Sequence, residues 1–118
     1  MIEIFHDFRF EAAHRLPNVS ADHKCSRLHG HSYKVTIHMG GEPDPDMGWF
    51  IDFGDLERIV RPVIDALDHR LLNDIGGLSN PTSEVIAAWI YEELAADLPL
   101  LTAVTVCETN DSGSTFRR

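Results

Sequence analysis

The sequence predicts an α+β domain: a four-stranded antiparallel sheet with two helices on one face, in the element order ββααββ. Two segments that alternate apolar and polar side chains open the chain, and such alternation is typical of half-buried strands. Two segments with apolar side chains at helical spacing follow, and two short strand-like segments end the chain. In order, the six segments are residues 2–14, 28–39, 56–67, 81–94, 101–109 and 115–118.

Length and composition limit the classes of protein to which this chain can belong. A chain of 118 residues is long enough for one hydrophobic core, so residues 1–118 are expected to form a single domain. The net charge of −9 argues against nucleic acid or an anionic membrane as a partner, because both attract basic surfaces. The sequence has neither a membrane-spanning apolar run nor a signal-peptide pattern at its start, so we expect a cytoplasmic protein.

Three histidines are predicted to meet at one end of the first two strands. His29 and His31 are two positions apart in the second strand, so their side chains share a face, about 7 Å apart along the backbone. His14 ends the apolar face of the first strand and approaches this pair if the strands form an antiparallel hairpin. Each histidine alone is more typical of a core or surface residue, whereas three together with an open fourth position are typical of catalytic zinc.

A cysteine, Cys25, lies in the loop just before the second strand. The chain has two cysteines, Cys25 and Cys107, and no export signal, which argues against a structural disulfide. Near a dication and basic residues, Cys25 is placed to be a thiolate that removes a proton. The alternative is a closed structural site in which Cys25 is the fourth metal ligand beside the three histidines. Cys107 has the pattern of a small apolar strand residue.

Basic side chains crowd around the same loop, although the chain as a whole is acidic. They are Arg15, Lys24 and Arg27, and together they would concentrate positive potential beside His29. A small anion is one partner for such a cluster. An ordinary solvated loop is the other interpretation.

Proline and capping residues predict where the helices begin. Asp52 or Gly54 is expected to start the first helix, and Pro62 within its pattern predicts a kink or a break. Asn80 is expected to cap the second helix, with Pro81 at the first helical position. The segment between the two helices is expected to be irregular.

Three further candidate site residues lie outside the cluster of three histidines: Asp68, His69 and Glu108. Asp68 and His69 would diverge on a regular helix, so a contact between them requires the irregular segment after the first helix. There the carboxylate would fix the tautomer of the imidazole and raise its basicity. The alternative is a helix-ending histidine favoured by the helix dipole. Glu108 continues the apolar face of the strand at 101–109, either at the edge of the core or as an exposed strand end.

Five sequence blocks, in one order along nearly the whole chain, carry a family resemblance. They resemble the 6-pyruvoyltetrahydropterin synthase superfamily, and within it the branch that forms 6-carboxy-5,6,7,8-tetrahydropterin in queuosine (7-deazaguanine) biosynthesis. The short Cys-x-x-x-His-Gly-His spacing and the PTSE helix start are similar to this branch, whereas the pyruvoyl branch typically has a longer gap after its cysteine. The blocks are FEAAHRL at 10–16, CSRLHGHSY at 25–33, LDHRLLND at 67–74, NPTSEVIA at 80–87 and CETNDSG at 107–113.

The resemblance implies both an assembly and a set of roles. It implies a tunnelling fold, in which subunits join their sheets into a barrel as a trimer, and two trimers stack as a hexamer with active sites between subunits. Zn²⁺ is the implied cofactor. The implied roles are His14, His29 and His31 as zinc ligands, Cys25 as the catalytic cysteine, Asp68 and His69 as a proton relay, and Glu108 as the carboxylate that anchors the pterin.

The resemblance also implies a reaction. The chain is expected to be a zinc-dependent carbon–carbon lyase that converts 7,8-dihydroneopterin triphosphate to 6-carboxy-5,6,7,8-tetrahydropterin and releases acetaldehyde and triphosphate. From the charge clustering, Lys24, Arg27 or Arg15 is expected to meet the phosphates. Two alternatives stay open: a 6-pyruvoyltetrahydropterin synthase, which eliminates triphosphate from the same substrate, and a non-catalytic zinc-stabilised module that binds pterins.

Overall fold

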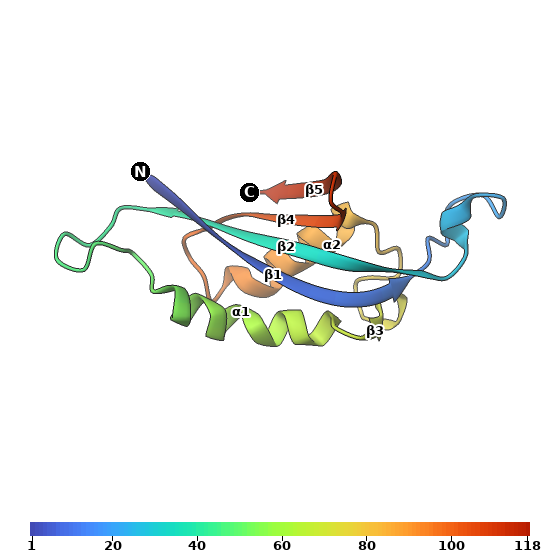
Figure 1. The fold of residues 1–118 in the computed structure, drawn as a ribbon, viewed down its shortest axis with the longest axis horizontal. Coiled ribbons are helices and arrows are strands. Elements are labelled where there is room, and N and C mark those ends of the chain that lie inside the picture. Colours follow the sequence, from blue (N-terminus) through green and yellow to red (C-terminus); the bar gives the residue numbers. More distant parts are fainter.

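The computed structural model describes residues 1–118 as a five-stranded sheet with both helices on one face (Figure 1). The strands lie in the order β3-β1-β2-β4-β5. The molecule is elongated, 58 × 23 × 22 Å, because β1 and β2 are each 13 residues long. The strands are β1 Ile2–His14, β2 His29–Gly41, β3 Arg70–Leu71, β4 Leu101–Thr109 and β5 Ser112–Arg117, and the helices are α1 Phe53–Leu67 and α2 Ser83–Ala95. Short 3₁₀ turns lie at Lys24–Ser26 and Leu72–Asp74.

The α+β class and the two helices on one face are confirmed, whereas the prediction of four antiparallel strands was wrong. β3 is a fifth strand, and it pairs in parallel with β1 through Arg70 opposite Ala12 and Leu71 opposite Ala13. The element order is therefore ββαβαββ. A strand of two residues has no alternation pattern, so periodicity could not reveal it.

The long β1–β2 hairpin was predicted correctly and sets the geometry of the candidate site. The two strands pair antiparallel from Ile2 opposite Gly41 to His14 opposite His29. β1 has the predicted bounds, and β2 extends two residues beyond its predicted end. The loop that joins the strands therefore lies at the same end of the molecule as the histidines (Figure 1).

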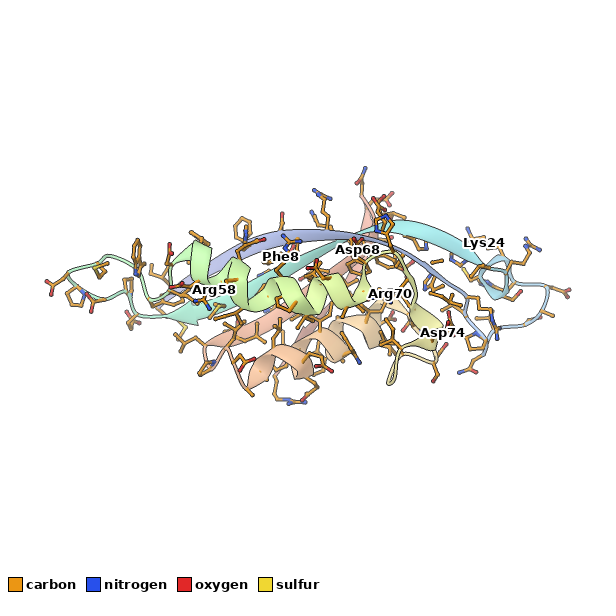
Figure 2. The ribbon with its side chains drawn as sticks, turned by 90° about the horizontal axis from the view of Figure 1, so that it is seen from below. Phe8, Lys24, Arg58, Asp68, Arg70 and Asp74 are labelled. Carbon is orange, nitrogen blue, oxygen red and sulfur yellow. The ribbon has the colours of Figure 1, made fainter.

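The hydrophobic core lies between the sheet and the helices. Leu56, Val60, Ile64 and Leu67 form the buried face of α1, and α2 buries a second apolar face beside them. Figure 2 shows α1 lying along the sheet, with Arg58 toward one end of the molecule and Lys24 toward the other. Neither helix combines the length and the apolar character that crossing a membrane would need. The sheet residues of the core are Phe8, Phe10, Ala12, Tyr33, Val35, Ile37, Met39, Leu101, Val104 and Val106.

α1 starts where the sequence predicted but runs through its proline. Asp52 is its N-cap residue, and the helix continues past Pro62, so of the predicted kink or break the break does not occur. Pro62 has no N–H to donate to the carbonyl of Arg58 one turn earlier. Both residues are solvent-exposed, so water can satisfy that carbonyl and the helix tolerates the proline.

α2 begins later than predicted. Its N-cap is Thr82 instead of Asn80, and the Thr82 hydroxyl accepts a hydrogen bond from the amide of Val85 at 3.2 Å. Both residue types cap helices well, so composition alone did not separate them. The later start leaves Pro81 outside the helix, with its carbonyl available for another partner.

Replacing Thr82 by alanine is expected to lower the free energy of unfolding by about 1 kcal/mol, because the first turn of α2 loses its side-chain acceptor. Urea unfolding of the two proteins measures the difference. Ser79→Ala is the matched control, since Ser79 is an exposed hydroxyl residue outside the helix. Equal losses in the two variants would contradict the assignment of Thr82 as the cap.

Candidate functional site

The three predicted histidines meet at the end of the β1–β2 hairpin. His14 and His29 are paired residues of the ladder, and His31 lies two positions further along on the same face. The three ring centroids are 4.6 to 5.0 Å apart, and one nitrogen from each ring lies within 4.8 Å of the others. The side-chain alternation that predicted this convergence is the feature that produces it.

Backbone carbonyls fix the tautomer of two of these imidazoles. His14 Nδ1 lies 2.8 Å from the carbonyl oxygen of Pro81, and His29 Nδ1 lies 2.8 Å from that of Arg27. A carbonyl only accepts, so each Nδ1 carries the proton and donates it, and each neutral ring has its lone pair on Nε2. These two Nε2 atoms face each other at 3.0 Å. A cation between them would remove the repulsion of two facing lone pairs.

His31 supplies the third nitrogen. Its Nε2 is buried and has no hydrogen-bond partner, and the nearest acidic group is Glu108, whose Oε2 is 3.7 Å away. Burial lowers the pKa of His14 and of His31, although the charge of Glu108 acts in the opposite direction. Both imidazoles therefore stay neutral at pH 7, which is the state that binds a metal ion.

These residues fit a zinc ion. Nitrogen atoms that share one tetrahedral zinc ion lie roughly 3.3 Å apart, given Zn–N bonds of about 2.0 Å. The facing Nε2 atoms of His14 and His29, 3.0 Å apart, are close to this spacing, and a ring nitrogen of His31 lies within 4.8 Å of both. The group of mutually close ligand atoms contains the three imidazoles and not the Cys25 thiol.

Cys25 lies beside the cluster on the wall of a cavity of about 370 Å³. It is held in the 3₁₀ turn, where its amide donates to His23 Nδ1 at 3.0 Å and its carbonyl accepts from the Leu16 amide at 2.8 Å. The thiol is half-buried and unpaired in a disulfide. The other residues that line the cavity are Lys24, His29, His31, Glu108 and Thr109.

Among the three basic candidates for phosphate contact, only one lines this cavity. Lys24 does so, whereas Arg15 and Arg27 are exposed residues outside its lining. The backbone of Arg27 contributes instead, through the carbonyl that accepts from His29. Arg15 is held by its backbone, which exchanges two hydrogen bonds with the side chain of Asn73.

Asp68 and His69 form the predicted contact in the irregular segment after α1. His69 Nδ1 lies 2.9 Å from Asp68 Oδ2, and His69 has a left-handed backbone with φ of 56°. That conformation is costly for a side chain larger than glycine, and it turns the ring back toward its neighbour. Asp68 Oδ1 accepts from the Glu11 amide at 2.9 Å. This amide, and secondarily the His69 hydrogen bond, lowers the pKa of Asp68 and keeps the carboxylate charged.

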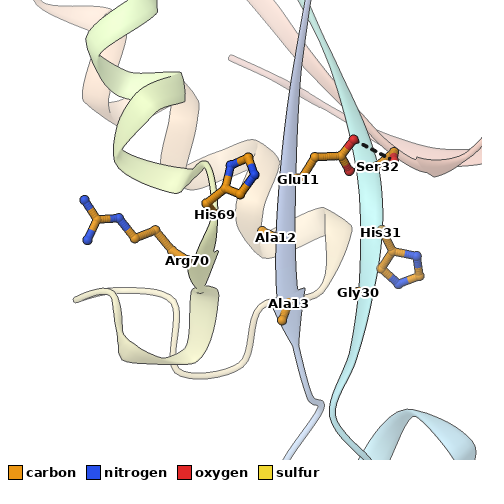
Figure 3. Close-up of a pocket in the computed structure, with 8 residues that line it drawn as sticks. All are labelled: Glu11, Ala12, Ala13, Gly30, His31, Ser32, His69 and Arg70. Carbon is orange, nitrogen blue, oxygen red and sulfur yellow. Dashed lines mark hydrogen bonds between the residues drawn. The ribbon is translucent and has the colours of Figure 1, made fainter.

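The Asp68–His69 pair does not reach the cavity that contains Cys25. His69 lines a second, open cavity of about 580 Å³. Figure 3 shows His69 and Arg70 on the β3 side of β1. The hydrogen bond from Ser32 to Glu11 joins β2 to β1. His31 contributes to the lining of both cavities. Within one chain, the thiol and the relay histidine therefore line separate cavities with one residue in common.

Glu108 lies at the edge of the core and is not an exposed strand end. It is half-buried, it lines the smaller cavity, and its carboxylate faces His31. The pairing of β4 with β5 shifts register between Cys107 and Thr109, so a bulge falls at Glu108. Bulges of this kind re-aim a side chain.

Sequence reasoning missed the groups that orient the histidines. The predicted start of the second helix puts Pro81 inside it, where its carbonyl would accept from an amide of the next turn and would not be free for His14. The carbonyl of Arg27 has no signal in the sequence, because every residue carries a backbone carbonyl. Recognising Thr82 as the cap would have been the signal for the first of these.

The fold and the site together define a class of protein: an α+β domain with three histidines that could hold a metal ion, beside a cavity sized for a small molecule. The family model for 6-pyruvoyl tetrahydropterin synthase matches residues 3–118. The chain belongs to this family.

Individual relatives differ in the activity that their names give. A 6-carboxy-5,6,7,8-tetrahydropterin synthase from Synechocystis sp. is 40% identical over 96% of this chain and 91% of its own length. A dihydroneopterin monophosphate aldolase from Pyrococcus furiosus is 36% identical over 88% of this chain and 87% of its own length. The solved structure of the Caenorhabditis elegans 6-pyruvoyl tetrahydropterin synthase matches with a TM-score of 0.91 at 29% identity, over 99% of this chain and 95% of that one.

Proposed function

We propose that this pterin synthase family member is a zinc-dependent lyase that converts 7,8-dihydroneopterin triphosphate to 6-carboxy-5,6,7,8-tetrahydropterin. The reaction takes up one water and releases acetaldehyde and triphosphate. The observation that carries the proposal is that Cys25, two of the candidate metal ligands and Glu108 line one cavity. The Synechocystis relative, whose name states the same product, supports this branch and with it a role in queuosine biosynthesis.

The candidate metal site supplies electrophilic activation to this chemistry. Zinc held by His14, His29 and His31 would supply a Lewis acid that makes protons of the substrate side chain easier to remove. The carbonyls of Pro81 and Arg27 hold two of the rings in the ligating tautomer.

Cys25 is the proposed base. Cys25 lines the cavity together with His29 and His31, and the basic residue Lys24 lines the same cavity. The thiolate accepts a proton from the substrate side chain. Glu108 is proposed to hold the pterin ring, because its two carboxylate oxygens can accept from the amino group and the ring N–H together.

Asp68 and His69 complete the proton transfers if chains assemble. Asp68 fixes the His69 ring through Nδ1 and leaves Nε2 free to exchange protons. Because His69 lines a different cavity from Cys25, we propose that the relay acts at the Cys25 cavity of a second subunit. β5 and most of β1 have unpaired outer edges, which support joining of sheets into the barrel of a tunnelling fold, as a trimer or a dimer of trimers.

Product identification tests the reaction. Zinc-loaded protein is incubated with dihydroneopterin triphosphate, and mass spectrometry identifies what is released. Acetaldehyde with 6-carboxytetrahydropterin is the expected result. A 6-pyruvoyl product without acetaldehyde would establish the second candidate function, which the family name and the C. elegans structure favour. Binding without any product would indicate the non-catalytic pterin-binding module.

Replacing Lys24 by alanine is expected to raise KM for the triphosphate substrate about tenfold, because a charge-assisted contact with phosphate is lost. Steady-state kinetics measures the change, and the same measurement on Arg27→Ala tests the second proposed phosphate contact. Lys34→Ala is the matched control, since it removes the other lysine of the chain, which does not line the cavity. Unchanged KM values would remove these residues from the phosphate site.

A further inference from the structure

Tyr33 is a buried polar residue to which the proposed mechanism gives no role. Its side chain is 0% exposed, and its hydroxyl has no hydrogen-bond partner. The one other buried side-chain atom without a partner is Nε2 of His31, a candidate metal ligand. A buried hydroxyl without a partner is costly, so this one points to a partner gained in another state of the protein.

The Tyr33 ring is fixed by aromatic neighbours. It stacks on Phe10, with centroids 4.7 Å apart and an interplanar angle of 9°. His14 and His31 make edge contacts with it, with centroid distances of 5.9 and 5.4 Å. Close packing on these sides prevents the hydroxyl from swinging to a distant acceptor. The partner must therefore approach the hydroxyl at its present position.

The register of the sheet makes Glu108 the candidate acceptor. The β2–β4 ladder pairs Lys34 with Cys107, so the next residues of the two strands, Tyr33 and Glu108, are cross-strand neighbours. The bulge between Cys107 and Thr109 re-aims the Glu108 side chain. A phenol O–H donates hydrogen bonds and a carboxylate accepts them, so the two groups are matched as donor and acceptor.

We propose that Tyr33 is a positioning residue whose O–H donates a hydrogen bond to the Glu108 carboxylate when a pterin is bound. In the structure, Glu108 Oε2 faces His31 Nε2 at 3.7 Å. Once that nitrogen is a metal ligand it cannot donate to the carboxylate, and the Tyr33 hydroxyl remains as a donor on the same strand. The hydrogen bond would fix the carboxylate plane toward the pterin ring. This inference rests on the proposed function, which assigns Glu108 to the ring.

A double-mutant cycle with neopterin as the probe tests the coupling. Calorimetric titration gives the dissociation constants of the zinc-loaded wild type, Tyr33→Phe, Glu108→Gln and the double variant. Tyr33→Phe is expected to weaken binding about tenfold in the wild-type background. In the Glu108→Gln background the same change is expected to cost less than about twofold, because the acceptor charge is already lost.

Thermal unfolding of the ligand-free protein separates positioning from a structural role. Phenylalanine keeps the packed ring and removes only an unpartnered hydroxyl, so the unfolding midpoint of Tyr33→Phe is expected to stay equal or rise while affinity for neopterin falls. Tyr91→Phe is the matched control. The Tyr91 hydroxyl donates to the carbonyl of Leu101 at 3.2 Å, so this variant is expected to lose stability and keep its affinity for neopterin.

Three results would overturn the inference: wild-type affinity in Tyr33→Phe, the same loss of affinity with and without the Glu108 carboxylate, or a joint loss of stability and affinity. The proposed function fails separately. If the wild type does not bind neopterin, both the pterin site and this inference are overturned. If the wild type binds neopterin and Glu108→Gln does not, while Tyr33→Phe binds normally, only the role of Tyr33 is overturned.

Discussion

Replacing His29 by alanine is expected to remove zinc from the protein and to lower turnover by more than about 100-fold. Loss of a group that only hydrogen-bonds to a metal ligand lowers activity by at most about 100-fold, so a larger loss indicates a ligand. His29 contributes one of the two Nε2 atoms that face each other at 3.0 Å, so the variant loses a ligand and not a supporting contact. Two imidazoles that remain hold a divalent ion far less tightly than three. Metal content by mass spectrometry after dialysis and the rate of product release measure the two effects.

His38→Ala is the control for this variant. His38 lies on the same strand but on the opposite face, where its Nε2 contacts the hydroxyl of Thr105 at 2.9 Å. It should keep its zinc and most of its activity. Zinc retained at one ion per chain in His29→Ala would contradict the three-histidine site.

Replacing Cys25 by alanine is expected to lower turnover by about 10² to 10⁴, the range that a positioned base contributes, while zinc content stays at the wild-type level. The reason is that the Cys25 thiol lines the cavity but is not one of the mutually close ligand atoms. Measuring both zinc content and turnover distinguishes a base from a fourth ligand, because replacing a ligand would also lower the zinc content.

Cys107→Ala controls for thiol removal as such. Cys107 is the other cysteine, it lies on β4 and it does not line the cavity, so both zinc and activity should persist. Loss of zinc in Cys25→Ala would support the closed structural site instead. Full activity in that variant would remove the thiol from the mechanism.

The parts of the site that follow from strand alternation could be predicted from the sequence. His29 and His31 share a face because strands alternate, and His14 joins them because the hairpin is antiparallel. The groups that orient them could not be predicted in this way. The Pro81 carbonyl reaches His14 across 67 positions of sequence, and only the packing of α2 against the sheet brings it there.

The contact between Asp68 and His69 could be predicted from the sequence, but the cavity that His69 lines could not. The side chains of adjacent residues diverge on a regular helix, so a contact between them requires another backbone conformation. His69 has a left-handed backbone, and its ring contacts Asp68. Which cavity the pair serves depends on β3, a strand of two residues that no periodicity reveals. His69 directly precedes the fifth strand and lies on the opposite side of β1 from His31 (Figure 3).

The hydrogen bond from His14 Nδ1 to the carbonyl of Pro81 has a consequence for variants remote from any ligand. If the chain just before α2 moves, the His14 ring is free to rotate and to exchange its tautomer, and its Nε2 no longer presents a fixed lone pair. Damage to the entry of that helix would then appear first as a deficit of bound zinc, with every histidine intact. If zinc is bound as proposed, its content would report on the docking of a segment that contains none of the candidate ligands.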